Sequence, residues 1–271
     1  MKSVVTVETR SVSAQRGKVH VARRHRKRGE DLLVFMHGFG CAKESFDGAF
    51  TAGALAEYSL LTFDFPEHGE SGSLPERADI EGAAEVVTSL LSEFDRRHLY
   101  LVCHSMGGAI GVVAARKLPD LAGFISVEGN LVADDCGLVS RGVAQQSAND
   151  FKERGFSEFV QWLERSPERS HREWVKWYRR CDPRGLHGLA KSLVDWCDHR
   201  DLAGILGTLG PSAYVHGSHS DVAHLKEILG DSMYQVDGAG HFPMIDEPDA
   251  FYRLIGERLD SFATNGWMAN A

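Results

Sequence analysis

The chain has 271 residues, of which 43% are hydrophobic, and its 30 basic and 38 acidic residues give a formal charge of −8. This length suits one large α/β domain with an inserted subdomain, and the acidic balance argues against a nucleic-acid binder. The five cysteines are scattered without a Cys-x-x-Cys pair, as is typical of a reducing cytoplasm. Without a leader-like or membrane-spanning apolar run, we expect a cytoplasmic protein that does not enter a membrane.

The first predicted elements are two strands in which apolar and polar residues alternate. They are VVTVET from Val4 and KVHVAR from Lys18, and this period of two is typical of half-exposed strands. The basic run from Arg23 to Arg28 is predicted to be a solvated hairpin tip between the early strands.

The next strands are predicted from short, continuous apolar runs. They are LLVFMHG from Leu32, LLTFDF from Leu60, LYLVCH from Leu99 and GFISVEG from Gly123. Such runs favour parallel strands that are buried on both faces. Helical patterns at residues 79–94 and 106–118 separate the later runs. The alternation predicts an α/β fold with a mainly parallel sheet.

This alternation is interrupted after Glu128. Roughly eighty residues with the pattern of short, polar-faced helices follow before the next buried strand, SAYVHG from Ser212. A helix, a strand and a last helix then complete the pattern. We therefore predict a core domain formed by residues 1–130 and 210–271, with a helical cap at residues 131–209.

A lone serine stands where the buried strand LVCH turns into a helix. In the stretch LVCHSMGG, Ser105 is flanked by small residues that permit a sharp and strained turn. Such a turn holds the hydroxyl at the carboxyl edge of the sheet, where ligands bind in open α/β folds. The helix that starts at Met106 directs its free N–H groups to the same point. Ser105 is the candidate nucleophile.

Four segments together resemble the α/β-hydrolase superfamily over nearly the whole chain. They are HGFG at residues 37–40, DFPEHGESG at 64–72, CHSMGG at 103–108 and GAGHFPMIDEP at 238–248. The resemblance implies an eight-stranded, mainly parallel sheet that is flanked by helices and carries an inserted helical cap. One departure is Cys103, because the family usually has glycine at the start of this turn.

The resemblance also implies a base for the serine. The loop GAGHF carries His241, which in this family lies over the nucleophile and takes its proton. The other histidines are interpreted as structural or as surface residues, since they lack paired carboxylate or cysteine ligands at metal-binding spacing: His37, His104, His216, His219 and His224. No metal or cofactor is expected.

The acid that orients the imidazole has two candidates. Glu128 ends an apolar strand 23 residues after Ser105, a placement similar to that in some haloalkane dehalogenases and coelenterazine luciferases. An unpaired buried carboxylate is costly, so a histidine partner would explain it. Asp221 is the alternative, because many members of the superfamily carry the acid after the penultimate strand. Asp221 lies one residue beyond Ser220, the position that this pattern predicts for the acid, and Glu128 is preferred.

Backbone groups complete the predicted chemistry. The amide N–H groups of Met106, which follows the nucleophile, and of Phe39, which follows HG, are the expected oxyanion hole. These roles need no particular side chain.

The predicted cap is rich in aromatic side chains. Trp174, Trp177 and Tyr178 share one helix face by their spacing, and they either pack the cap onto the core or line a substrate pocket together with Trp162. Three arginines of this region could meet an acidic substrate, although solvated arginines are more common: Arg141, Arg179 and Arg180.

These residues predict a serine hydrolase whose partner is a small-molecule substrate. A carboxylic ester, thioester or lactone would acylate Ser105, with His241 as base and Glu128 as acid. The alternatives are carbon–carbon bond hydrolysis or perhydrolysis by the same Ser–His pair, and a non-catalytic ligand receptor. The sequence indicates neither the individual substrate nor the oligomeric state.

Overall fold

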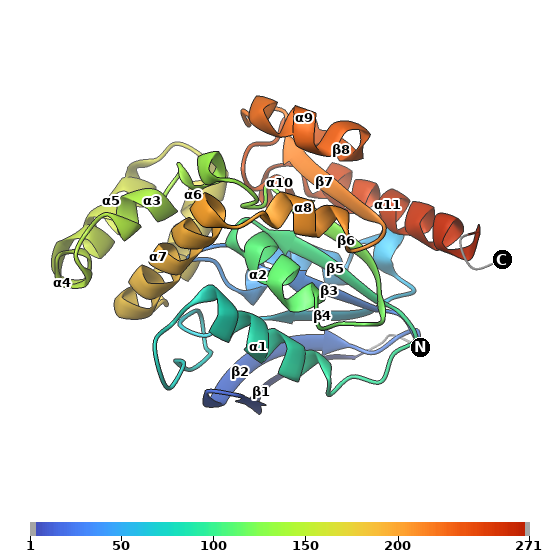
Figure 1. Cartoon of the computed structure of the whole chain (residues 1–271), viewed down its shortest axis with the longest axis horizontal. Helices are drawn as coiled ribbons and strands as arrows, with labels where there is room; N and C mark the ends of the chain where they lie inside the picture. The colour runs from blue at the N-terminus through green and yellow to red at the C-terminus, as the bar shows by residue number, and fades with distance from the viewer. Residues whose placement is uncertain (1–3, 269–271) are drawn as a thin grey trace.

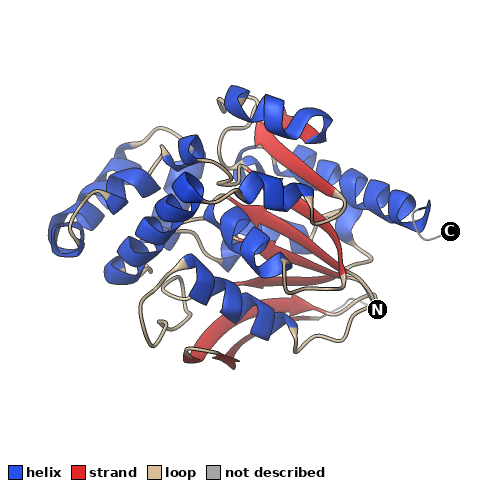
Figure 2. Ribbon diagram, viewed as in Figure 1, coloured by secondary structure: helices blue, strands red, loops and turns tan. Residues whose placement is uncertain are grey.

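The computed structural model describes residues 4–268 and contains one eight-stranded sheet with strand order β1-β2-β4-β3-β5-β6-β7-β8. The first two pairings, β1 with β2 and β2 with β4, are antiparallel, and all others are parallel. This arrangement confirms the predicted fold class (Figure 2). The strands are β1 (Val5–Ala14), β2 (Gly17–Arg26), β3 (Leu32–Met36), β4 (Ser59–Phe63), β5 (Leu99–His104), β6 (Leu121–Val127), β7 (Ser212–Gly217) and β8 (Met233–Val236).

The burial of the strands follows their place in the sheet. Every residue of β3, β4 and β5 is buried, as the continuous apolar runs predict for central parallel strands. Strand β1 lies at the edge and most of its residues are exposed. The most apolar runs therefore occupy the middle of the sheet, where Ser105 follows β5.

Helices cover both faces of the sheet (Figure 1). On one face lie α1 (Ile80–Leu91), α2 (Met106–Ala115) and α8 (Leu202–Gly207). On the other lie α11 (Pro248–Met268) and the 3-10 helices η1 (Lys43–Phe50) and η2 (Gly53–Leu55). The start of α1 is fixed locally, because the side chain of Asp79 accepts a hydrogen bond from the Gly82 N–H at 2.7 Å.

The segment between β6 and β7 forms a helical group at one end of the sheet (Figure 1). It comprises η3 (Ala133–Cys136), α3 (Ser140–Ala144), α4 (Ala148–Asp150), η4 (Phe151–Gly155), α5 (Phe156–Arg165), α6 (Arg169–Tyr178) and α7 (Pro183–His199). The last helix of the segment, α8, contacts α2 instead. Exact domain boundaries at residues 131 and 209 stay a prediction.

Shorter elements complete the chain after β7. They are η5 (Ala223–Leu225), α9 (Lys226–Leu229), η6 (Gly230–Ser232) and α10 (Pro243–Asp246). The loop between β8 and α10 carries His241.

The basic run is not the solvated hairpin tip that the sequence predicts. Arg23 and Arg26 lie in β2 and are only 7% and 6% exposed. The Arg23 guanidinium pairs with the carboxylates of Glu8 and Glu93, each at 2.8 Å. Arg26 donates to backbone carbonyls of the η1–η2 region at 2.8 Å. Because these partners satisfy the guanidinium groups, basic residues are accommodated inside a paired strand.

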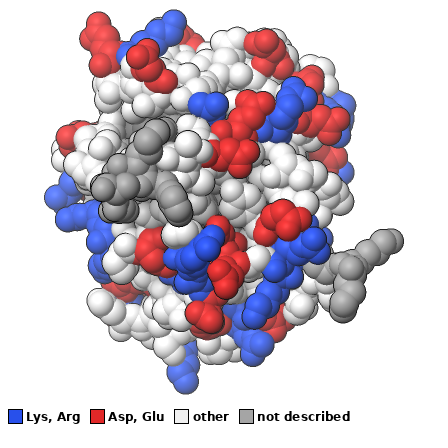
Figure 3. All heavy atoms as spheres, turned by 90° about the vertical axis from the view of Figure 1, so that its right-hand side faces the viewer, with Lys and Arg blue, Asp and Glu red and all other residues white. Residues whose placement is uncertain are grey.

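The surface shown in Figure 3 carries acidic and basic side chains that are intermixed, without a broad area of one sign. Such a face produces no extended electrostatic field of a single sign. Among the described helices, none combines the length and apolar character needed to cross a membrane.

Candidate active site

Ser105 occupies a strained turn between β5 and α2. Its φ of 53° and ψ of −124° lie in a region that side chains rarely adopt, and its hydroxyl does not cap the helix. Such a conformation costs on the order of 1–3 kcal/mol and persists only where the surroundings enforce it. Here the Ser105 N–H donates to the carbonyl of Val127 at 2.9 Å, which ties the turn to β6. The turn therefore leaves the hydroxyl free of a helical role.

Glycines allow the chain to close tightly around this turn. A Cβ at Gly107 would lie 2.6 Å from the carbonyl oxygen of His37, and one at Gly38 would lie 2.9 Å from the Cβ of Ser105. The side chain of Cys103 packs against α2 at Gly111, one helical turn after Gly107. A Cβ at Gly111 would lie 2.7 Å from the Cys103 Sγ. The absence of a side chain at Gly111 in α2 therefore leaves room for the Cys103 side chain.

His241 is fixed by its backbone as well as by its ring. The Nε2–H of His104 donates to the His241 carbonyl at 2.8 Å, and the two rings lie 4.9 Å apart between centroids. Burial lowers the pKa of His104 well below its usual value, so this residue remains a neutral donor. His104, interpreted from sequence only as structural, holds the loop that carries the candidate base.

Glu128 is the carboxylate that the structure brings to His241. Its Oε2 lies 3.4 Å from the His241 Nδ1, and its Oε1 accepts from the Gly217 N–H at 2.7 Å. Burial acts to raise the pKa of Glu128, but the hydrogen bond and charge of His241, together with the Gly217 N–H, lower it overall. Asp221 is exposed, and its Oδ1 accepts from the Ala223 N–H at 3.2 Å.

Asn130 contacts the candidate nucleophile and was not predicted. The Ser105 hydroxyl donates to the Asn130 Oδ1 at 3.3 Å, and the Asn130 Nδ2 donates to the carbonyl of Asp135 at 2.7 Å. The second bond fixes which end of the amide faces the serine. The signal was its position, two residues after Glu128 at the carboxyl end of β6, which pairs with β5.

The loop after β3 is held by two neutral histidines. The His37 Nε2 accepts from the Phe65 N–H at 3.0 Å, and the His68 Nε2 accepts from the Gly40 N–H at 3.1 Å. Burial lowers the pKa of His68 to about 4, which keeps the acceptor available. These bonds fix the backbone around Phe39.

The two predicted oxyanion donors lie on either side of the serine turn. Met106 is the first residue of α2, so its N–H has no acceptor within the helix. The Phe39 carbonyl accepts from the indole Nε1 of Trp174 at 3.1 Å. This contact links α6 to the segment that bears the Phe39 N–H.

A cavity of about 20 Å³ surrounds the serine. Its polar lining includes Ser105, His241, Asn130, Asp135 and His104, and its apolar lining includes Phe39, Leu138, Val139, Trp174 and Phe242. This volume is close to that of a single water molecule. Side chains that line the cavity must therefore shift to admit a substrate.

The four aromatic residues that the sequence assigns to a cap have different surroundings. Trp174 lines the cavity, whereas Trp177 and Tyr178 are buried outside its lining. Trp162 is 48% exposed and stacks on Phe159.

The three arginines that the sequence suggests for an acidic substrate pair with carboxylates away from the cavity. Arg141 pairs with Asp198, Arg179 with Glu164 and Arg180 with Glu44. None of them is among the residues that line the cavity around Ser105.

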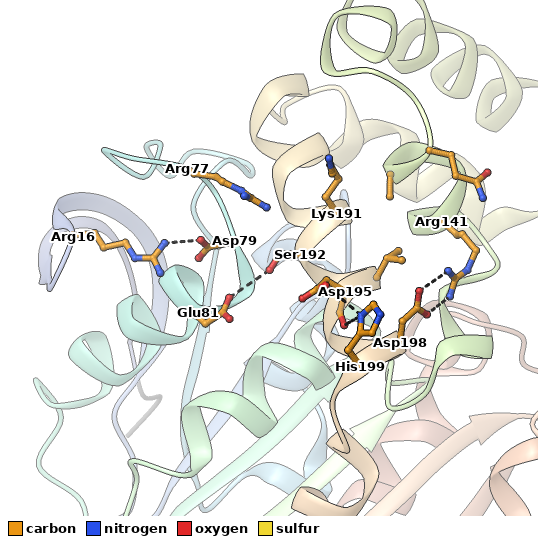
Figure 4. A pocket seen from close by; sticks show the side chains of 13 residues that line it. Arg16, Arg77, Asp79, Glu81, Arg141, Lys191, Ser192, Asp195, Asp198 and His199 are labelled. Carbon is orange, nitrogen blue, oxygen red and sulfur yellow. Dashed lines mark hydrogen bonds and ion pairs between the residues drawn. The ribbon is translucent and has the colours of Figure 1, made fainter.

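A larger hollow of about 680 Å³ lies between α1 and the helices α3 and α7 (Figure 4). Ion pairs line this hollow, including Arg16 with Asp79 at 2.6 Å and Arg141 with Asp198 at 2.7 Å. Neither Ser105 nor His241 lines it. Because the residues that the sequence predicts as nucleophile and base line the small cavity and not this hollow, the small cavity is the candidate active site despite its lesser volume.

Strand order, a strained serine at a strand–helix turn and a loop histidine beside a buried carboxylate define the α/β-hydrolase fold, and the protein is an enzyme of that class. A model of the alpha/beta hydrolase family matches residues 33–254, so the chain belongs to this family.

Curated relatives include the 2-succinyl-6-hydroxy-2,4-cyclohexadiene-1-carboxylate synthase of Escherichia coli. The two sequences are 26% identical over 249 residues, which cover 90% of this chain and 84% of the synthase.

Solved structures with the same fold include esterases and lactonases. A thermophilic esterase from Thermogutta terrifontis aligns with a TM-score of 0.76 at 19% identity, covering 95% of this chain and 99% of the esterase. An N-acyl homoserine lactonase aligns with a TM-score of 0.77 at 18% identity, covering 95% and 97%. At these identities the likeness concerns the fold.

Proposed function

We propose that the protein is a serine hydrolase that cleaves a small or medium carboxylic ester, thioester or lactone. Ser105 is the nucleophile, His241 the base and Glu128 the acid, while the N–H groups of Phe39 and Met106 stabilise the oxyanion. The observation that carries this proposal is the His241 imidazole, which lies 3.4 Å from the Glu128 carboxylate and lines the same cavity as the Ser105 hydroxyl.

The reaction begins with a change of partner at the serine. The Ser105 hydroxyl leaves Asn130 by rotation about its Cα–Cβ bond and donates to the Nε2 of His241, a bond that substrate-free sites often lack. Its oxygen attacks the acyl carbon as His241 takes the proton, and Glu128 stabilises the imidazolium. Two N–H groups bind the oxyanion, each worth about 3 kcal/mol in comparable sites.

The acyl-enzyme is then resolved by water. Collapse of the tetrahedral intermediate breaks the bond to the leaving group, which takes the proton from His241. Water gives its proton to the same imidazole and attacks the acyl carbon, and the second collapse returns the proton to Ser105. The products are a carboxylic acid and an alcohol or thiol, or one hydroxy acid from a lactone. These reaction steps require no cofactor or metal.

The test uses short p-nitrophenyl esters and a fluorophosphonate probe. The wild-type protein is expected to hydrolyse p-nitrophenyl butyrate and to carry one probe molecule at residue 105. Ser105→Ala is expected to lose both properties while keeping its melting temperature within a few degrees. Turnover at the wild-type rate in that variant would refute the mechanism. A wild-type protein that ignores the probe but is stabilised by a small molecule would instead be a receptor.

Carbon–carbon bond cleavage or a lyase-like reaction is the second candidate. It is favoured by the sequence match to the Escherichia coli synthase over 90% of this chain. The product in that enzyme's name is a carboxylate. By contrast, no lysine or arginine that could pair with a carboxylate is among the residues that line the described cavity. Turnover of a β-diketone panel that exceeds ester turnover in kcat/KM would favour this candidate.

A further inference from the structure

We propose that the active site accepts uncharged esters and lactones and rejects substrates whose acyl group carries a carboxylate, with Asp135 as the residue that determines this preference. The inference rests on the proposed function and specifies its substrate class. It is carried by the charges and the apolar groups that face the cavity.

The cavity lacks a cationic side chain that could pair with a substrate carboxylate. Within residues 4–268, its lining includes two histidines but no lysine or arginine. Of these, His104 is kept neutral by burial, which lowers its pKa, and His241 faces Glu128. A carboxylate that leaves water for such a wall is not compensated, and this transfer is strongly unfavourable.

Asp135 adds a negative charge to the same wall. Its Oδ1 lies 2.7 Å from the His224 Nε2, while its Oδ2 accepts from the N–H groups of Leu131 and Val132 at 2.8 and 2.9 Å. The Asp135 side chain is only 8% exposed. Both oxygens are already engaged, so the carboxylate is held rigidly and is not free to bind a substrate cation. The carboxylate therefore places a fixed negative charge at the cavity wall, which disfavours a substrate anion there.

The mouth of the cavity favours an apolar acyl chain. Leu138 lines the cavity and is 54% exposed, so its side chain borders both the cavity and the solvent. Val139, Trp174 and Phe242 continue the apolar lining toward Ser105. An uncharged acyl chain that enters past Leu138 buries its own apolar surface against these groups. Charge and apolar surface thus select the same substrate class.

The experiment compares two esters that differ only in a distal charge. The substrates are p-nitrophenyl methyl adipate and p-nitrophenyl hydrogen adipate, which share a leaving group, and spontaneous hydrolysis is subtracted. In wild-type protein we expect kcat/KM for the neutral ester to exceed that for the anion by about a hundredfold, which corresponds to about 2.7 kcal/mol. Equal kcat/KM values for the two esters would overturn the inference.

Three variants assign the preference to named residues. Asp135→Asn keeps the hydrogen-bond acceptor but removes the charge, and it is expected to reduce the neutral-to-anion ratio about tenfold. The matched control is Asp134→Asn, since Asp134 is exposed in the same segment and does not line the cavity. It should leave the ratio unchanged. Leu138→Arg places a cation at the exposed mouth and should raise kcat/KM for the anion at least tenfold.

The outcomes separate this inference from the proposed function. If Asp135→Asn fails to fold, Leu138→Arg still tests the preference, because its side chain is exposed. An unchanged ratio in every folded variant would refute the assignment to Asp135 and the mouth. Calorimetric binding of dimethyl adipate and monomethyl adipate to Ser105→Ala measures the preference without turnover. A wild-type protein without ester turnover whose Ser105→Ala variant still prefers the diester would contradict only the proposed function.

Discussion

Replacement of Glu128 by glutamine tests which carboxylate serves His241. The two side chains have the same shape, and the glutamine carbonyl can still accept from the Gly217 N–H that now binds the Glu128 Oε1 at 2.7 Å. At 3.4 Å, unit charges in a medium with an effective dielectric constant of about 20 attract by about 5 kcal/mol. The His241 side chain is 26% exposed, and solvent screening reduces this value to about 4 kcal/mol.

The loss applies to the imidazolium in the transition state, so we expect kcat to fall about a thousandfold. The assay is p-nitrophenyl butyrate hydrolysis at pH 8, with circular dichroism melting as the check of folding. The matched control is Asp221→Asn, because Asp221 is exposed and asparagine can still accept from the Ala223 N–H. We expect it to change kcat by less than about twofold. A thousandfold loss in Asp221→Asn, with near wild-type turnover in Glu128→Gln, would refute this reasoning.

Two further predictions concern stability. Gly111→Ala places a Cβ 2.7 Å from the Cys103 Sγ, so it should reduce the free energy of unfolding by about 1–3 kcal/mol. In the double variant, Cys103→Gly should restore most of this loss. Additive effects of the two substitutions in urea unfolding would contradict the contact. Burial lowers the pKa of His68 to about 4, so the unfolded chain, whose histidine pKa is about 6.5, binds the proton first. The stability from this group is complete above about pH 6.5 and falls by about 3 kcal/mol as the pH approaches 4. His68→Gln should flatten that part of the pH dependence in urea unfolding, and an unchanged slope would contradict the assignment.

The sequence determined the sheet and the placement of the candidate nucleophile because both depend on local patterns. Runs such as LYLVCH favour a strand buried on both faces, and β5 is buried at every residue. The change from this run to a glycine-flanked helix at Ser105 indicates the turn whatever the rest of the chain does. Local patterns were misleading for the basic run, since the partners that bury Arg23 are Glu8 and Glu93, distant in the sequence.

Only the tertiary structure decided which side chains meet around the serine. Glu128 and Asp221 are both candidates from the sequence, but the carboxylate that approaches His241 depends on how the loops after β6, β7 and β8 are arranged. Asn130 and Asp135 likewise reach the cavity because the chain folds back beside the end of β6. Contacts between side chains far apart in the sequence depend on packing and loop geometry, which the spacing of residues along one chain does not encode. Strand burial and turn strain, by contrast, are properties of consecutive residues.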